Sequence, residues 1–252
     1  MTNNQNPPIP SNVRFVMRME RVFRNWIPIL LTLFALFNLL PILAPIAMQA
    51  GLAPVGNLIY DLYGSLISHQ YANRSFFLFG DKIMYEAHEL PIEFTGEFLP
   101  DTLALKAFRG SPEFGWKLAW SDRLVAMFGS MLVVFVAYTL RKWRNFPLWL
   151  GVLLVLPLIL DGATHLASDS ASVISGWRYD NEWLANLTNH AFPESFYVGD
   201  AFGSFNSWMR LLTGILFGIG FFGWSLPIVD RYFERNANIL AEKLDNWRKR
   251  QV

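Results

Sequence analysis

Residues 147–167 read PLWLGVLLVLPLILDGATHLA, and this stretch is the strongest indication of the fold class. It is apolar throughout its first two thirds, and its only charged residue is Asp161. A helix of about 20 apolar residues is long enough to cross the hydrocarbon core of a membrane. The stretch therefore predicts a transmembrane helix that carries an acidic residue and a histidine, His165, near one end.

Three further stretches have the same length and character, namely residues 26–48, 119–140 and 207–229. The whole chain is 53% hydrophobic and only 16% charged, whereas roughly a quarter of residues are charged in soluble domains. The sequence predicts an all-α, polytopic membrane protein with four transmembrane helices and a single integral membrane domain over residues 1–252.

The positions of basic residues predict the orientation of these spans. Arginines precede the first span, a basic link joins the second span to the third, and a basic tail at 230–252 follows the fourth. The loops at 49–118 and 168–206 are acidic. Because basic loops stay on the cytoplasmic side, we expect cytoplasmic N- and C-termini and outer loops at 49–118 and 168–206. The membrane that we expect is a prokaryotic plasma (inner) membrane.

Two amphipathic segments accompany the spans. Residues 51–70 place apolar side chains at helical spacing and predict a helix on the outer surface. Residues 230–250 set Ile239, Leu240 and Leu244 against several basic residues. They predict a C-terminal amphipathic helix, either on an anionic cytoplasmic leaflet or as a solvated tail.

The unusual polar residues of the chain gather at the predicted outer end of the spans. Ionisable groups at the edge of hydrocarbon are costly unless they are paired or used. We expect a pocket in which arginines bind a lipid headgroup or another small anion, such as a phosphate, pyrophosphate or carboxylate. The ligand-binding candidates are Arg74, Arg123, Arg210, Gln70 and Asn206. The candidates for proton transfer, if the site is catalytic, are Asp161, His165 and His69.

A structural interpretation competes with this one, because Asp161 could pair with Arg123 or Arg210 and lock the helices together. His69, His165 and Asp161 could in principle bind zinc or iron, but no short ligand spacing supports a metal site, and none is predicted. The chain has no cysteine, which excludes thiolate ligands, and no motif indicates a cofactor. His88 and His190 lie in acidic loops and are expected to be solvated.

The sequence also predicts partners. Membrane lipids are expected from the spans, and a net charge of +1 argues against nucleic acid. Gly214 and Gly218 lie one helical turn apart and let another helix approach closely, whether the second or third span of this chain or a further membrane subunit. Together with the acidic outer loops, they suit a non-catalytic accessory subunit of a larger complex in an energy-converting or photosynthetic membrane. A transporter is less favoured, because the four spans show no inverted repeat.

Several short motifs resemble the prokaryotic membrane family called domain of unknown function 2085. The corresponding stretches are Ser68-His69-Gln70 with Arg74-Ser75-Phe76, then Ser121-Asp122-Arg123-Leu124, Asp161-Gly162-Ala163-Thr164-His165, and Asn206 through Arg210 to Thr213-Gly214. Three family cysteines are replaced by Ser68, Ser121 and Leu124, a glutamine is replaced by His165, and an acidic insertion separates Phe79 from Trp120. The resemblance implies a fold and topology, and no activity.

Overall fold

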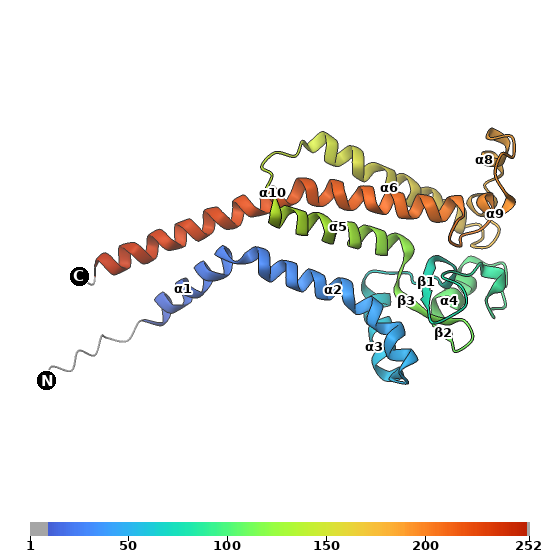
Figure 1. The fold of residues 1–252 in the computed structure, drawn as a ribbon, viewed down its shortest axis with the longest axis horizontal. Helices are drawn as coiled ribbons and strands as arrows, with labels where there is room; N and C mark the ends of the chain where they lie inside the picture. The colour runs from blue at the N-terminus through green and yellow to red at the C-terminus, as the bar shows by residue number, and fades with distance from the viewer. Residues whose placement is uncertain (1–9, 251–252) are drawn as a thin grey trace.

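A computed structural model describes residues 10–250 of the chain. Four of its helices are long and apolar enough to cross a membrane. They are α2 (Trp26–Gln49), α5 (Asp122–Leu140), α6 (Leu148–Asp169) and α10 (Phe205–Lys249). α10 packs against both α5 and α6 and is the centre of the bundle (Figure 1). The predicted fold class, a helical membrane protein with four spans, is confirmed.

The fourth span and the tail helix form one continuous helix. α10 has 45 residues and continues through Pro227, which gives it a length of about 67 Å, roughly twice the hydrocarbon thickness. Its second half extends beyond α5 and α6 (Figure 1). There it packs against α1 (Ser11–Arg24), where the rings of Phe23 and Phe233 lie 5.4 Å apart. The two amphipathic helices therefore cover part of each other's apolar faces.

Gly214 and Gly218 of α10 face α5 of the same chain. A Cβ atom added at Gly214 would lie 2.8 Å from the backbone oxygen of Arg123, and one at Gly218 would lie 2.0 Å from Oγ of Ser130. The second span is thus the helix that uses this close approach. The idea that these two glycines are available to another subunit is not supported by their position.

Residues 50–121 and 170–204, together called the cap here, cover one end of the bundle. The predicted helix at 51–70 is present as α3 (Ala53–Leu66), which packs on α2. The cap also contains an antiparallel sheet that the sequence did not predict, with strand order β1-β3-β2. Its strands are β1 (Ser75–Leu78), β2 (Gly110–Ser111) and β3 (Gly115–Ser121). Because Ala119 and Trp120 belong to β3, the second span begins at Asp122.

The remaining elements of the cap are short. The first loop adds the 3-10 turns η1 (Ala72–Arg74) and η2 (Ala87–Glu89) and the helix α4 (Phe98–Ala107). The second loop contains α7 (Trp177–Asp180), α8 (Glu182–Leu187) and α9 (Glu194–Tyr197).

The two loops share one small core and are joined by a buried carboxylate. Phe77, Tyr85 and Leu105 of the first loop pack with Val173 of the second. The carboxylate of Glu86 accepts hydrogen bonds from the backbone N–H groups of residues 200 and 201, at 3.0 and 2.9 Å. The shared core and the two hydrogen bonds to Glu86 fix the position of both loops over the helix ends.

A buried lysine holds the backbone of the first loop together. Lys117 in β3 is fully buried, and its Nζ donates to the carbonyl oxygens of Gln70 (2.6 Å), Lys106 (2.9 Å) and Leu105 (3.3 Å). Burial lowers the pKa of this ammonium well below its ordinary value, and Arg109 and Lys106 lower it further. Three carbonyls match the three donors of an ammonium, so Lys117 links β3 to two other segments of the cap.

Candidate functional site

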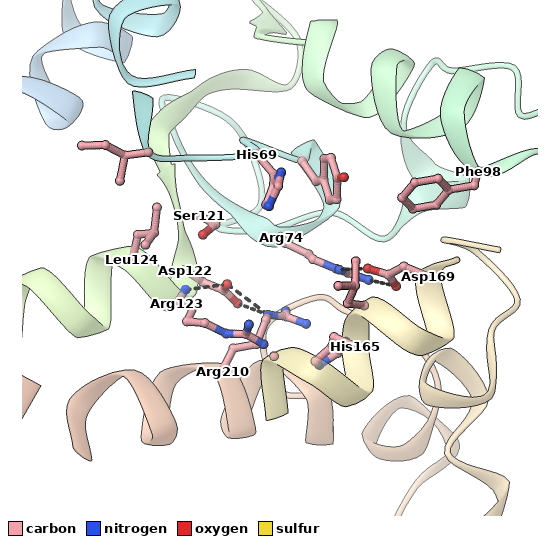
Figure 2. A pocket seen from close by; sticks show the side chains of 14 residues that line it. His69, Arg74, Phe98, Ser121, Asp122, Arg123, Leu124, His165, Asp169 and Arg210 are labelled. Carbon is pink, nitrogen blue, oxygen red and sulfur yellow. Dashed lines mark hydrogen bonds and ion pairs between the residues drawn. The ribbon is translucent and has the colours of Figure 1, made fainter. Parts of the chain in front are cut away.

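Arginines and aspartates from the cap and from three spans meet where the cap joins the helix ends (Figure 2). The arginines are Arg74, Arg123, Arg178 and Arg210, and the aspartates are Asp122, Asp161, Asp169 and Asp200. Buried charges are tolerated when they are paired and hydrogen-bonded. The site is thus an ion-pair network in which each charge has an opposite neighbour.

Asp200 is the most connected carboxylate of the network. It accepts hydrogen bonds from Nδ2 of Asn73 (3.1 Å), Nε of Arg74 (2.9 Å) and Nη1 of Arg210 (2.6 Å). Burial alone raises the pKa of Asp200, but Arg74 and Arg210 outweigh burial and hold it below its ordinary value. Asp200 therefore remains ionised and ties η1 and the second loop to α10.

Arg74 and Arg210 are fully engaged by carboxylates. The two terminal nitrogens of Arg74 meet the two oxygens of Asp169 at 2.6 and 2.8 Å, a bidentate geometry that favours strong pairing. Arg210 binds Asp122 through Nε at 2.8 Å and the backbone oxygen of Asp200 through Nη2 at 2.5 Å. Burial by itself lowers the pKa of Arg74, but Asp200 and Asp169 raise it above its ordinary value.

A second chain of contacts joins α5, α6 and α7. Asp161 accepts from Nη2 of Arg123 at 2.6 Å and from Nη2 of Arg178 at 2.8 Å. The predicted structural pairing of Asp161 with Arg123 is therefore present. Nε2 of His165 lies 3.2 Å from Nη2 of Arg178. Because an arginine can only donate, Nε2 accepts, and the neutral ring carries its proton on Nδ1.

A pocket of about 320 Å³ lies beside this network, between the cap and the ends of α5, α6 and α10. Its polar lining comes from His69, Tyr71, Arg74, Ser121, Asp122, Arg123, His165, Asp169 and Arg210. Its apolar lining comes from Ile67, Phe98, Leu124, Gly162 and Leu166. Ile67 is 39% exposed and Leu166 is 66% exposed, so apolar side chains form part of its rim.

Two pocket-lining side chains retain buried nitrogens without a partner. Within residues 10–250, neither Nε of Arg123 nor Nδ1 of His165 has a hydrogen-bond partner. Leaving a buried donor unpaired costs about 1–3 kcal/mol. Both groups are donors, so a ligand that accepts hydrogen bonds would relieve this cost.

The predicted residues divide into two groups. Arg74, Arg123, Arg210, His69 and His165 line the pocket, whereas Asp161, Gln70 and Asn206 do not. The amide nitrogen of Gln70 donates to the backbone oxygens of Tyr60 and Ala119, at 3.0 and 2.9 Å. That of Asn206 donates to the backbone oxygens of Arg178 and Gly199, at 2.6 and 2.9 Å. Both amides therefore hold the backbone around the site.

Sequence reasoning missed the counter-charges. The sequence assigned Asp169 and Asp200 only to the acidic character of the second outer loop, and it did not single out Arg178 or Asp122 as site residues. The available signal was the excess of arginines at one end of the spans, since each buried arginine requires a carboxylate nearby.

The geometry gives no metal centre among the described residues, because no three His, Asp or Glu side chains lie together in a way that could hold an ion. His69, His165 and Asp161 thus do not form one cluster of ligands. His88 and His190 are exposed, as predicted.

Arg123, Asp161, His165, Asn206 and Arg210 follow one another along the chain on three spans and converge on one end of the bundle. Residues 113–223 match the family described as Predicted membrane protein (DUF2085). The DUF2085 match contains α5, α6 and the first half of α10, and most of the ion-pair network with them. His69, Gln70 and Arg74 lie outside it, as does most of the acidic insertion. No curated protein and no solved structure matches this chain.

Proposed function

We propose that this protein binds a small anionic group, of the phosphate or carboxylate class, in the pocket under the cap. The observation that carries the proposal is the pair of unpartnered donors on Arg123 and His165. Arg74 and Arg210 also line the pocket, but their hydrogen bonds go to aspartates, so the free donors belong to Arg123 and His165. The anion can come from a lipid headgroup or from solution.

The proposed role is binding rather than catalysis. Asp161 is held by two arginines, and Nε2 of His165 faces Arg178. A group that moves protons must be able to reach the reacting atom. These contacts occupy both oxygens of Asp161 and Nε2 of His165, which leaves only the protonated Nδ1 of His165 as a hydrogen-bond donor. His69, which is exposed and lines the pocket, is assigned to its entrance.

The proposal is tested by the thermal stability of the purified protein in detergent, with inorganic phosphate or with chloride at equal ionic strength. A ligand that binds only the folded state at 100 times its Kd stabilises it by about 2.7 kcal/mol. Phosphate is expected to raise Tm of the wild type and of Arg109→Gln, but not of Arg123→Gln.

Arg109 is a matched control, since its side chain is 29% exposed against 21% for Arg123 and it also pairs with an aspartate, Asp61. It lies in the same end of the molecule but does not line the pocket. An equal response of both variants would contradict the proposal.

A second candidate function is that of a non-catalytic accessory subunit, and one observation favours it. α1 and the second half of α10 project beyond the spans and leave Phe15 and Tyr232 exposed at 63% and 61%. Exposed aromatic side chains are enriched at protein interfaces. Native mass spectrometry of the protein from its own membrane tests this candidate, because an accessory subunit carries other polypeptides with it in fixed stoichiometry.

A further inference from the structure

We infer that the ligand is an anionic membrane lipid whose headgroup occupies the pocket and whose hydrocarbon chain lies in the apolar groove between α2 and α3. The inference rests on the proposed function, which it deepens by choosing the lipid over the free anion. Its evidence is the position of the groove relative to the pocket.

The groove has a volume of about 260 Å³ and an apolar lining. α2 contributes Leu33, Leu36, Phe37 and Leu40, and α3 with its following residue contributes Leu62, Tyr63, Leu66 and Ile67. From Leu33 to Leu40 the groove follows α2 for about 10 Å. That shape suits a length of extended hydrocarbon chain.

The floor of the groove is fixed by two aromatic residues. Tyr63 donates its hydroxyl to the backbone oxygen of Phe37 at 2.7 Å, and the two rings lie 5.5 Å apart. Phe37 in turn packs against Trp120, which lies two residues before the start of α5. The groove is therefore a preformed surface joined to the same core as the site.

Ile67 lines both the groove and the pocket. A ligand that extends from the arginines to the groove would therefore pass along Ile67. The apolar rim of the pocket is the side from which such a ligand would leave it. The polar pocket and the apolar groove thus meet at Ile67, which is the arrangement that an amphipathic ligand requires.

The two parts of the site have different tasks. Membrane lipid tails are as apolar as leucine, so moving a chain from the bilayer into the groove gains little by itself. The donors in the pocket select for a charged headgroup. The preformed groove fixes the direction of the lipid chain, which reduces the entropy cost of binding.

The experiment is native mass spectrometry of the purified full-length protein after exposure to an equimolar mixture of phosphatidylglycerol and phosphatidylcholine, with phosphate stabilisation measured in parallel. The groove is filled in Leu36→Trp and, separately, Leu62→Trp. Leu160→Trp is the control, since Leu160 is about as exposed on α6 (57%, against 52% for Leu36) and lies outside the groove.

The wild type and Leu160→Trp are expected to retain phosphatidylglycerol in preference to phosphatidylcholine. Each groove variant is expected to retain about fivefold less, a loss of about 1 kcal/mol, because the indole ring occupies the space that the lipid chain would use. Both groove variants should still be stabilised by inorganic phosphate, which also shows that they are folded.

The other outcomes separate the two proposals. If phosphate stabilises the wild type and the groove variants retain as much phosphatidylglycerol as Leu160→Trp, the ligand is a free anion and the lipid inference is overturned. If a second copy of the chain replaces lipid in the wild type and dissociates in the groove variants, the inference is also overturned. If phosphate acts equally on the wild type and Arg123→Gln, the proposed function itself fails.

Discussion

Arg210 shows what an arginine needs in order to lie buried at the end of a transmembrane helix. Its side chain is 3% exposed, and Nε, Nη1 and Nη2 all donate to Asp122 or to residue 200. The charge is thereby neutralised and its donors are used. Sequence alone could treat this residue as one that binds an external anion, because Asp122 lies 88 residues away in the chain and Asp200 lies in the loop before the helix.

Replacing Arg210 by alanine is expected to destabilise the fold strongly. Removing one member of a buried ion pair costs about 3–5 kcal/mol, because the remaining charge is buried without a partner. Arg248→Ala should change stability by less than about 0.5 kcal/mol, since Arg248 is exposed and pairs only with exposed Asp245. Thermal unfolding followed by circular dichroism in detergent measures both. Similar Tm values for the two variants would contradict the assigned role of the network.

The lowered pKa of Asp200 predicts acid sensitivity. In the unfolded chain the Asp200 carboxyl has its ordinary pKa of 3.8, and in the folded protein its pKa is lower. The stability that Asp200 contributes is therefore fully present above pH 3.8 and is lost as the pH falls through the lower folded value.

Tm measured from pH 7 down to pH 3 should fall less steeply in Asp200→Asn than in the wild type, from a lower starting point. Asp180→Asn, at an exposed position, should follow the wild type. Parallel pH profiles for the wild type and Asp200→Asn would mean that another carboxylate dominates.

At the scale of elements, the contact between α5 and α10 depends on glycine at specific positions. A Cβ at Gly218 would lie 2.7 Å from the backbone oxygen of Met127, whereas a Cβ at Gly129 on α5 would meet no atom within 4 Å. The same chemical change should thus have opposite effects on two neighbouring helices.

Gly218→Ala is expected to destabilise the protein by about 1–3 kcal/mol through overpacking. Gly129→Ala is expected to stabilise it by up to about 1 kcal/mol, because alanine favours a helix more than glycine does. Unfolding of both variants by denaturing detergent measures the difference. A stabilised Gly218→Ala variant would show that the two helices are not in close contact in the membrane.

At the scale of the whole molecule, the charge pattern and the cap together predict orientation. The cap sits at the end of the bundle opposite to α1 and the end of α10 (Figure 1), and the basic residues gather near the latter. By the positive-inside rule the cap, and the pocket with it, should face outward.

The absence of cysteine in the chain permits a direct test. Asp180→Cys in the cap should react with a membrane-impermeant maleimide in intact cells. Asp245→Cys on α10 should react only after the membrane is made permeable. The reverse pattern would place the pocket on the cytoplasmic side and would overturn the proposed topology.

The four spans, and the end of the bundle where the polar residues gather, follow from local properties of the sequence. Length and hydropathy are local properties, and the cost of charge in hydrocarbon restricts where residues such as Arg123 and Asp161 can lie. The first three spans agree with the observed helices to within three residues, whereas the helix of the fourth continues to Lys249. Ala119 and Trp120 belong to β3, because their apolar character is equally compatible with a buried strand.

Three features became known from the three-dimensional arrangement alone. They are the pairing of the charges, the sheet in the cap and the identity of the donors that remain free. Arg74, Asp169 and Asp200 come from segments far apart in the chain, and short strands of the cap gain stability from packing with each other. Such contacts depend on distance in space, which hydropathy and spacing do not encode. The ion pairs engage Arg74 and Arg210, whereas Arg123 and His165, which line the same pocket, keep an unpaired nitrogen each.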